Sequence, residues 1–139
     1  TAYRRQRQMC IRDRFVISNH MRELNLQEEK LLEELISRSN IKIPSNWKND
    51  LLVSPLHDGK MGSLTLFPHN TLNKERHFGV QVSECQFKDI DGVPVIASLY
   101  LDKDNELFEL DIWKVDFSKL EMIPSHFEDV EYSNQIPKK

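Results

Sequence analysis

The sequence predicts an α+β domain in which an N-terminal helix packs on an antiparallel meander sheet of about five strands. Two patterns carry this prediction. Apolar residues recur at helical spacing over residues 25–38, whereas the segments after Trp47 alternate with a period of two and are separated by short turns. Short connections favour antiparallel neighbours. With 139 residues, the chain is long enough for one such domain and short for two.

The helix has a start signal, an apolar stripe and a stop. Asn25 and Glu28 have the spacing of a capping box, in which each side chain accepts a hydrogen bond from the backbone of the other residue. The apolar stripe that follows consists of Leu31, Leu32, Leu35 and Ile36. Because Pro44 prevents any continuation, the sequence predicts a helix over residues 25–38.

Five segments are expected to form strands, because each is rich in β-branched and aromatic residues and is bounded by turn residues. They are 51–53, 63–67, 78–87, 93–101 and 107–115. The turns at 89–92 and 102–106 each contain a residue suited to left-handed backbone. In the second turn this residue is Asn105. In the third strand the parity of the apolar residues switches near Ser83 and Glu84, which indicates a β-bulge there.

Charge is distributed unevenly along the chain. Residues 1–20 carry five arginines and one aspartate, a net charge of +4, whereas residues 21–139 carry 14 basic and 21 acidic residues, a net charge of −7. An acidic body argues against nucleic acid as the partner, because phosphate backbones attract basic surfaces. The charge favours a basic protein as the partner instead.

The two ends of the chain are expected to lie outside the folded domain, which we place at residues 21–124. Residues 1–20 have no apolar period, and the string at 5–14 resembles a translated sequencing-adapter remnant. We therefore interpret residues 1–20 as a non-native or disordered basic tail, take Met21 as the true start, and expect deletion of the tail to leave stability unchanged. Residues 125–139 are polar and acidic and are expected to form a flexible tail.

Cysteine and histidine spacing gives no sign of a metal site, a cofactor or a disulfide framework. Cys10 and Cys85 lack zinc-site spacing, and the five histidines show no HxH or HxxxH pattern. Two scattered cysteines fit a reducing, cytoplasmic compartment. No apolar run approaches the ~20 residues that a membrane-spanning helix needs. We expect a cytoplasmic protein with no cofactor, no metal and no membrane partner, and we leave its oligomeric state open.

The run LFELDIWKVDFSKL at residues 107–120 is the most informative for function. A period of two sends alternate side chains to opposite faces of a strand. The expected core face consists of Phe108, Leu110 and Ile112, and the other face consists of Glu109, Asp111 and Trp113. Two carboxylates beside an indole form either a functional site or a solvated surface, with Arg76, Lys88 or Lys114 as counter-charges.

Two functions fit this pattern. The preferred hypothesis is a non-enzymatic protein-binding module, such as an immunity protein that neutralises a basic toxin, with a binding surface formed by Glu109, Asp111, Trp113 and Lys114. The alternative is a small hydrolase or lyase in which Glu109 and Asp111 act as acid and base and His77 or His57 carries the proton. Cys85 would be a nucleophile beside such a histidine or a small core residue, and its alternation with apolar neighbours favours the core.

Six short motifs carry a resemblance over residues 21–124. They lie at 21–24, 51–53, 58–64, 76–79, 91–93 and 106–120, and ELDIWKVDF at 109–117 is the most specific. Together they resemble a small bacterial family catalogued as a domain of unknown function, number 6984. Asn105 departs from the glycine expected in that family's turn, but asparagine tolerates left-handed backbone. The resemblance implies no activity, cofactor or catalytic residue.

Overall fold

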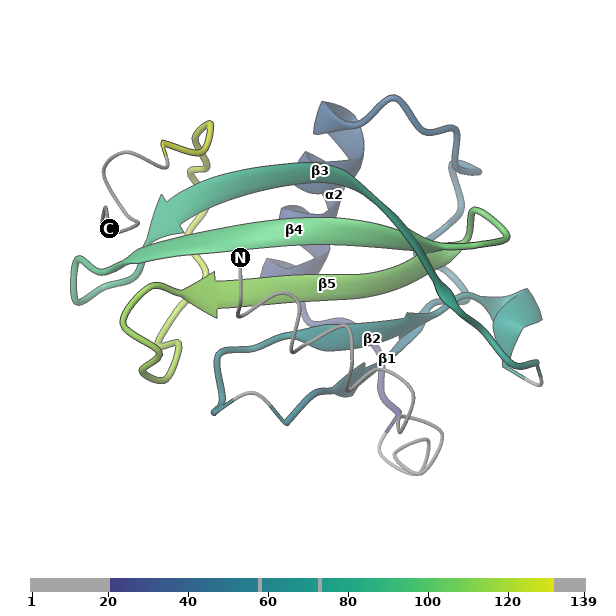
Figure 1. Cartoon of the computed structure of the whole chain (residues 1–139), viewed down its shortest axis with the longest axis horizontal. Helices are drawn as coiled ribbons and strands as arrows, with labels where there is room; N and C mark the ends of the chain where they lie inside the picture. Colours follow the sequence, from purple (N-terminus) through teal and green to yellow (C-terminus); the bar gives the residue numbers. More distant parts are fainter. Residues whose placement is uncertain (1–20, 58, 73, 132–139) are drawn as a thin grey trace.

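The computed structural model describes residues 21–57, 59–72 and 74–131, so the prediction for residues 1–20 lies outside the described part. The elements are α2 (Leu26–Arg38), β1 (Leu52–Pro55), β2 (Leu64–Phe67), the 3₁₀ turn η2 (His69–Thr71), β3 (Phe78–Lys88), β4 (Pro94–Asp102) and β5 (Leu107–Lys114). One helix lies behind one face of a five-stranded sheet (Figure 1). The predicted α+β fold is confirmed. No helix in the described part is long and apolar enough to cross a membrane.

The predicted capping box starts α2. Asn25 Oδ1 accepts from the Glu28 backbone N–H at 2.8 Å, and Glu28 Oε1 accepts from the Asn25 N–H at 3.0 Å. Arg22 adds two hydrogen bonds of 2.8 Å to the same carboxylate. Because the two capping-box hydrogen bonds satisfy backbone N–H donors at the helix start, they fix where α2 begins.

The sheet has the strand order β1-β2-β5-β4-β3, and all its pairs are antiparallel. β5 is therefore a central strand, paired with β2 on one side and β4 on the other (Figure 1). A strictly sequential order would place β3 beside β2, but here β3 forms an edge. Each edge strand also carries a one-residue bridge, Arg22 with Val53 on β1 and Glu128 with Gln86 on β3.

The main core lies between α2 and the sheet. Leu31, Leu32 and Leu35 of α2 are fully buried against alternate residues of the strands. On the central strand these alternate residues include Leu110 and Ile112, as predicted. Burying a leucine side chain is worth roughly 1.5–3 kcal/mol, so the apolar stripe of α2 is what holds the helix on this face.

A bulge changes the predicted role of Phe108. Tyr100 pairs with Glu109 but Leu101 pairs with Leu107, so Phe108 is the extra residue on β5. Leu107 consequently occupies the core position that we predicted for Phe108, whose ring instead packs against the guanidinium of Arg76 at 5.1 Å. An inserted residue reverses the parity of the strand on one side of it, which a strict period of two cannot anticipate.

The bulge predicted in β3 is present next to its expected place. The register of β3 against β4 shifts between Gln81 and Ser83, and a second shift lies between Phe78 and Val80. Bulges of this kind increase local twist and make an edge strand a poorer template for pairing with another chain.

The segment that we expected to be a flexible tail makes contacts along its described part, residues 125–131. The ring of Phe127 packs edge-on against Phe87 with centroids 5.9 Å apart. Glu128 exchanges backbone hydrogen bonds of 2.8 and 2.9 Å with Gln86. Asp129 accepts a 2.5 Å hydrogen bond from Arg38. The polar composition concealed two apolar residues that pack on the domain, Phe127 and Val130, and a sheet edge that pairs with the backbone of this segment.

Candidate functional site

Glu109, Asp111 and Trp113 lie on the sheet face opposite α2, because Leu110 and Ile112 between them point into the helix-covered core. We call this face, formed by these three residues and their cross-strand neighbours, the acidic face. Trp113 packs there with Met61 and Ile96. The central position of β5 places the carboxylates near the middle of the sheet (Figure 1).

Hydroxyl-bearing residues flank the two carboxylates. Glu109 lies between Thr65 of β2 and Tyr100 of β4 in the strand register, and Asp111 lies opposite Ser98. Ser63, just before β2, adds a hydroxyl 3.5 Å from Asp111 Oδ1. The same Ser63 oxygen accepts the Ile112 backbone N–H at 2.8 Å. The surroundings of the acidic face are thus rich in hydrogen-bonding groups.

The acidic face is buried. Glu109 is 2% exposed and Asp111 is 1% exposed, so the solvated surface that we considered at the sequence level is not what the structure contains. An ionised carboxylate at such depth is costly unless cations or hydrogen-bond donors surround it. Glu109 and Asp111 both take part in hydrogen-bonding or electrostatic interactions in the folded domain.

Phe117 adds an exposed aromatic ring next to Trp113. The two rings are tilted, with centroids 6.1 Å apart, and Phe117 is 54% exposed. Its backbone has φ 64°, which is rare for a bulky residue, and its N–H donates to the Lys114 carbonyl at 2.8 Å. Sequence reasoning missed Phe117. The signal was the Asp116-Phe117-Ser118 turn, in which the Asp116 carboxylate accepts from the Ser118 backbone at 3.0 Å.

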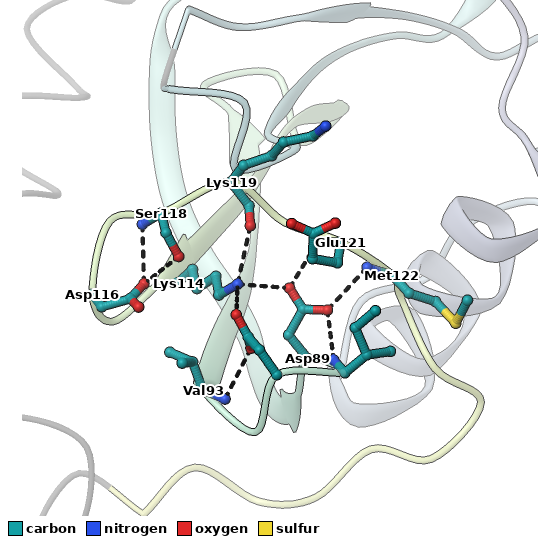
Figure 2. Close-up of polar contacts among 10 residues, drawn as sticks. Asp89, Val93, Lys114, Asp116, Ser118, Lys119, Glu121 and Met122 are labelled. Carbon is teal, nitrogen blue, oxygen red and sulfur yellow. Dashed lines mark hydrogen bonds and ion pairs between the residues drawn. The ribbon is translucent and has the colours of Figure 1, made fainter.

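Lys114, which we predicted to bind a partner, is internal. Its side chain is 1% exposed, and Nζ donates to Asp89 at 2.9 Å, to Asp91 at 2.6 Å and to the Lys119 carbonyl at 3.0 Å (Figure 2). These three acceptors use all three ammonium hydrogens. Lys114 also has the parity of the core residues rather than that of Asp111 and its neighbours, so the structure does not bring it to the acidic face.

Asp89 organises the segment after β5. Its carboxylate accepts from the backbone N–H groups of Glu121 at 2.7 Å and Met122 at 3.0 Å, as well as from Ile90 at 2.7 Å (Figure 2). Burial raises the pKa of Asp89, but the hydrogen bonds from Glu121, Lys114, Ile90 and Met122 outweigh it and hold this pKa below its ordinary value. Burial lowers the pKa of Lys114, and its two aspartate partners more than reverse this. Lys114 and Asp89 therefore have a structural role, because together they hold the segment after β5 against the turn after β3.

Arg76 forms a second internal cluster. Its Nε donates to Asp102 at 2.8 Å, Nη1 donates to the Leu66 carbonyl at 2.6 Å, and Nη2 donates to the Leu107 carbonyl. Both charged side chains are buried. Asp102 also accepts from two backbone N–H groups of the β4–β5 turn, those of Asp104 and Glu106. Arg76 therefore joins β2, β5 and this turn instead of balancing charge on the acidic face.

The structure does not bring His77, the proposed proton carrier, to the two carboxylates. His77 is exposed, and its Nε2 lies 3.3 Å from Glu75 rather than beside Glu109 or Asp111. Cys85 is buried in the main core, and desolvation raises its pKa to about 12. A thiol of that kind is a poor nucleophile, so Cys85 is a small core residue.

Comparison with known proteins gives one family. The family described as "Domain of unknown function (DUF6984)" matches residues 21–124, which are also the bounds that we predicted for the resemblance. No curated protein and no solved structure matches the chain.

Proposed function

Since this chain belongs to the DUF6984 family, a domain of unknown function, we propose its function from its own geometry: it is a non-enzymatic, protein-binding module. The binding surface is the acidic face together with the exposed Phe117 at its end. The partner is a protein with a basic surface, and a toxin held by an immunity-like protein is one concrete form. A cytoplasmic location, in keeping with the buried free thiol of Cys85, is part of this proposal.

One observation supports this proposal most. Two carboxylates and an indole stand in a row on one face of the central strand, and an exposed phenyl ring continues the row. Carboxylates in a low-dielectric setting form strong, charge-assisted hydrogen bonds with arginine and lysine. Large aromatic side chains are the commonest anchors of protein interfaces. The acidic body adds long-range attraction that speeds the encounter with a basic partner.

Burial and exposure suggest an order of events. Phe117 is accessible, whereas Glu109 and Asp111 are buried. In our proposal the partner first contacts Phe117, and its basic side chains reach the carboxylates as the buried part of the face opens. In the open state, ion pairs with the partner replace the interactions that the carboxylates make in the closed domain.

The positions of the other groups favour binding over catalysis. The alternative, a hydrolase or lyase that uses Glu109 and Asp111, needs a proton carrier within hydrogen-bond reach of the reacting group. His77 pairs with Glu75, so it does not fill this role as it stands. The bridges on both sheet edges also make edge-to-edge pairing of two copies a poorer explanation than recognition through a face.

A capture experiment with matched variants tests the proposal. The full chain carrying an affinity tag is incubated with a lysate of its host, and captured proteins are quantified by mass spectrometry for wild type, Phe117→Gly, Asp111→Asn and Leu26→Ala. Glycine suits the left-handed backbone at position 117. Leu26 is an exposed apolar residue on α2, away from the acidic face, and serves as the control.

The expected result is a basic protein that wild type and Leu26→Ala capture alike and that Phe117→Gly and Asp111→Asn capture at least about tenfold less, the loss typical of an interface anchor. Raising the salt concentration should weaken this capture, because screening reduces attraction between opposite charges. Equal capture by all four proteins, or capture of acidic proteins only, would overturn the proposal.

A further inference from the structure

A separate hollow of about 490 Å³ is lined by residues of the loop that joins β1 to β2 and of the start of α2. Three of its lining residues are basic: Arg22, His57 and Lys60. Pro55 and Leu56 add an apolar wall. A hollow of this size that combines a few converging polar groups with apolar contacts is typical of a small-molecule site. A cluster of basic residues is also unexpected on so acidic a body.

Arg22 is fixed in place at the wall of the hollow. Its backbone pairs with Val53 through hydrogen bonds of 2.8 and 2.7 Å, and its guanidinium holds both oxygens of Glu28. The hydrogen bond with Glu28 raises the pKa of Arg22, so the guanidinium stays charged. Its side chain is still 41% exposed. Because Glu28 balances Arg22, the remaining positive charge among the described lining residues is that of Lys60.

Lys60 supplies an ammonium group at this site, and His57 supplies an imidazole ring. Both are exposed, and across the described residues neither has a carboxylate oxygen within 4.0 Å of its side-chain nitrogens. The Lys60 carbonyl accepts the Leu120 N–H at 3.1 Å, which ties the loop to the segment after β5. An ammonium that has no ion-pair partner among the described residues is available to an anion from solution.

The loop holds Lys60 in an unfavourable backbone conformation. Lys60 has φ 65°, Gly59 before it has φ 74°, and Gly62 two residues after it has φ 101°. A side-chain-bearing residue in the left-handed region is strained, and such strain is commonest at ligand sites. Successive residues of this kind also form turns whose backbone N–H groups favour anions. The strained lysine and the hollow are independent observations that point to the same ligand chemistry.

We propose that this hollow binds the phosphate group of a small phosphomonoester. Lys60 and His57 hold the phosphate oxygens, Arg22 adds charge from the wall, and the apolar part of the ligand lies against Pro55 and Leu56. The site and its ligand are independent of the protein partner proposed for the acidic face.

Titration calorimetry of the full chain with phenyl phosphate, and with phenol as the uncharged probe, tests this inference. The variants are Lys60→Asn, in which asparagine tolerates the left-handed backbone, and Lys88→Gln, an exposed lysine of β3 outside the hollow. Thermal unfolding of each variant checks that it is folded.

We expect saturable binding of phenyl phosphate to wild type and to Lys88→Gln, binding at least about tenfold weaker to Lys60→Asn, and no measurable binding of phenol. If Lys60→Asn and Lys88→Gln bind phenyl phosphate with equal affinity, the proposed location of the site is wrong. Phenol binding as tightly as phenyl phosphate, or no saturation by wild type up to about 10 mM phenyl phosphate, would overturn the anion chemistry.

Discussion

Lys114 and Asp89 form an ion pair inside the domain: Lys114 Nζ lies 2.9 Å from Asp89 Oδ2, and the two side chains are 1% and 0% exposed. The pair joins the end of β5 to the turn after β3. Because Asp89 also accepts from the backbone of Glu121 and Met122, it fixes the path of the chain beyond the sheet. Lys114, which the sequence pattern assigned to a binding surface, thus has a structural role inside the domain.

Replacing Lys114 with methionine should destabilise the protein strongly. Methionine fills a similar volume, but the Asp89 carboxylate would then be buried without its cation, which is more costly than losing both partners. We expect the melting temperature to fall on the order of 10 °C in thermal unfolding. Lys119→Met is the control, because that side chain is exposed and only the Lys119 carbonyl contacts Lys114. Similar melting temperatures for both variants would contradict a structural role for the pair.

Asp89 should also make stability depend on pH in acid. Its folded-state pKa lies below the ordinary value of about 3.9. Its contribution is therefore fully present above that ordinary value and is lost as the pH falls through the folded-state value. The difference in unfolding free energy between wild type and Asp89→Asn should be constant from about pH 7 to pH 5 and should shrink below about pH 4. Urea unfolding at pH 7, 5 and 3 measures this difference.

The exposed Asp50 provides the control for that experiment, since Asp50→Asn removes a carboxylate without removing a buried contact. The difference between wild type and Asp50→Asn should stay small at every pH. If the difference in unfolding free energy between wild type and Asp89→Asn instead grows in acid, the direction of the pKa shift assigned to Asp89 is wrong.

Arg76→Lys should not be a conservative change. The guanidinium donates in three directions, to Asp102 and to the carbonyls of Leu66 and Leu107. Lysine carries a single nitrogen at the end of a shorter side chain, so it cannot reach all three acceptors. Leaving a buried acceptor without its donor costs about 1–3 kcal/mol of stability. We therefore expect the free energy of unfolding, measured with urea, to fall by at least about 2 kcal/mol. Lys74→Arg, on the exposed neighbouring loop, should change stability by less than about 0.5 kcal/mol.

Cys85 should be inert in the folded protein. Burial raises its pKa to about 12, so the thiolate that reacts with disulfide reagents is scarce at pH 8. In a Cys10→Ser background, Ellman's reagent should label no thiol in the native state and one thiol after unfolding in guanidinium. Rapid labelling of the native protein would contradict the core position of Cys85 and would reopen a catalytic role for it.

The sequence by itself determined the local structure. The capping box of Asn25 and Glu28 involves residues three apart, so its residue types suffice to predict the start of α2. The turn at Asn105 likewise has the left-handed backbone that its residue type suggested, with φ 64°. Alternation on β5 correctly placed Leu110 and Ile112 in the core, because a period of two is a property of any strand.

Only the tertiary structure decided what lies between distant segments. The internal positions of Arg76 and Lys114 depend on Asp102 and Asp89, which are 26 and 25 residues away in the sequence. The strand order and the bulge at Phe108 likewise depend on how separate strands pair. The burial of the two carboxylates also depends on the tertiary structure. Alternation puts Glu109 and Asp111 on one face of the sheet, but how deeply they are buried depends on the segments that pack around them. Local patterns fix the direction in which a side chain points, whereas its environment is set by long-range packing, which no short stretch of sequence encodes.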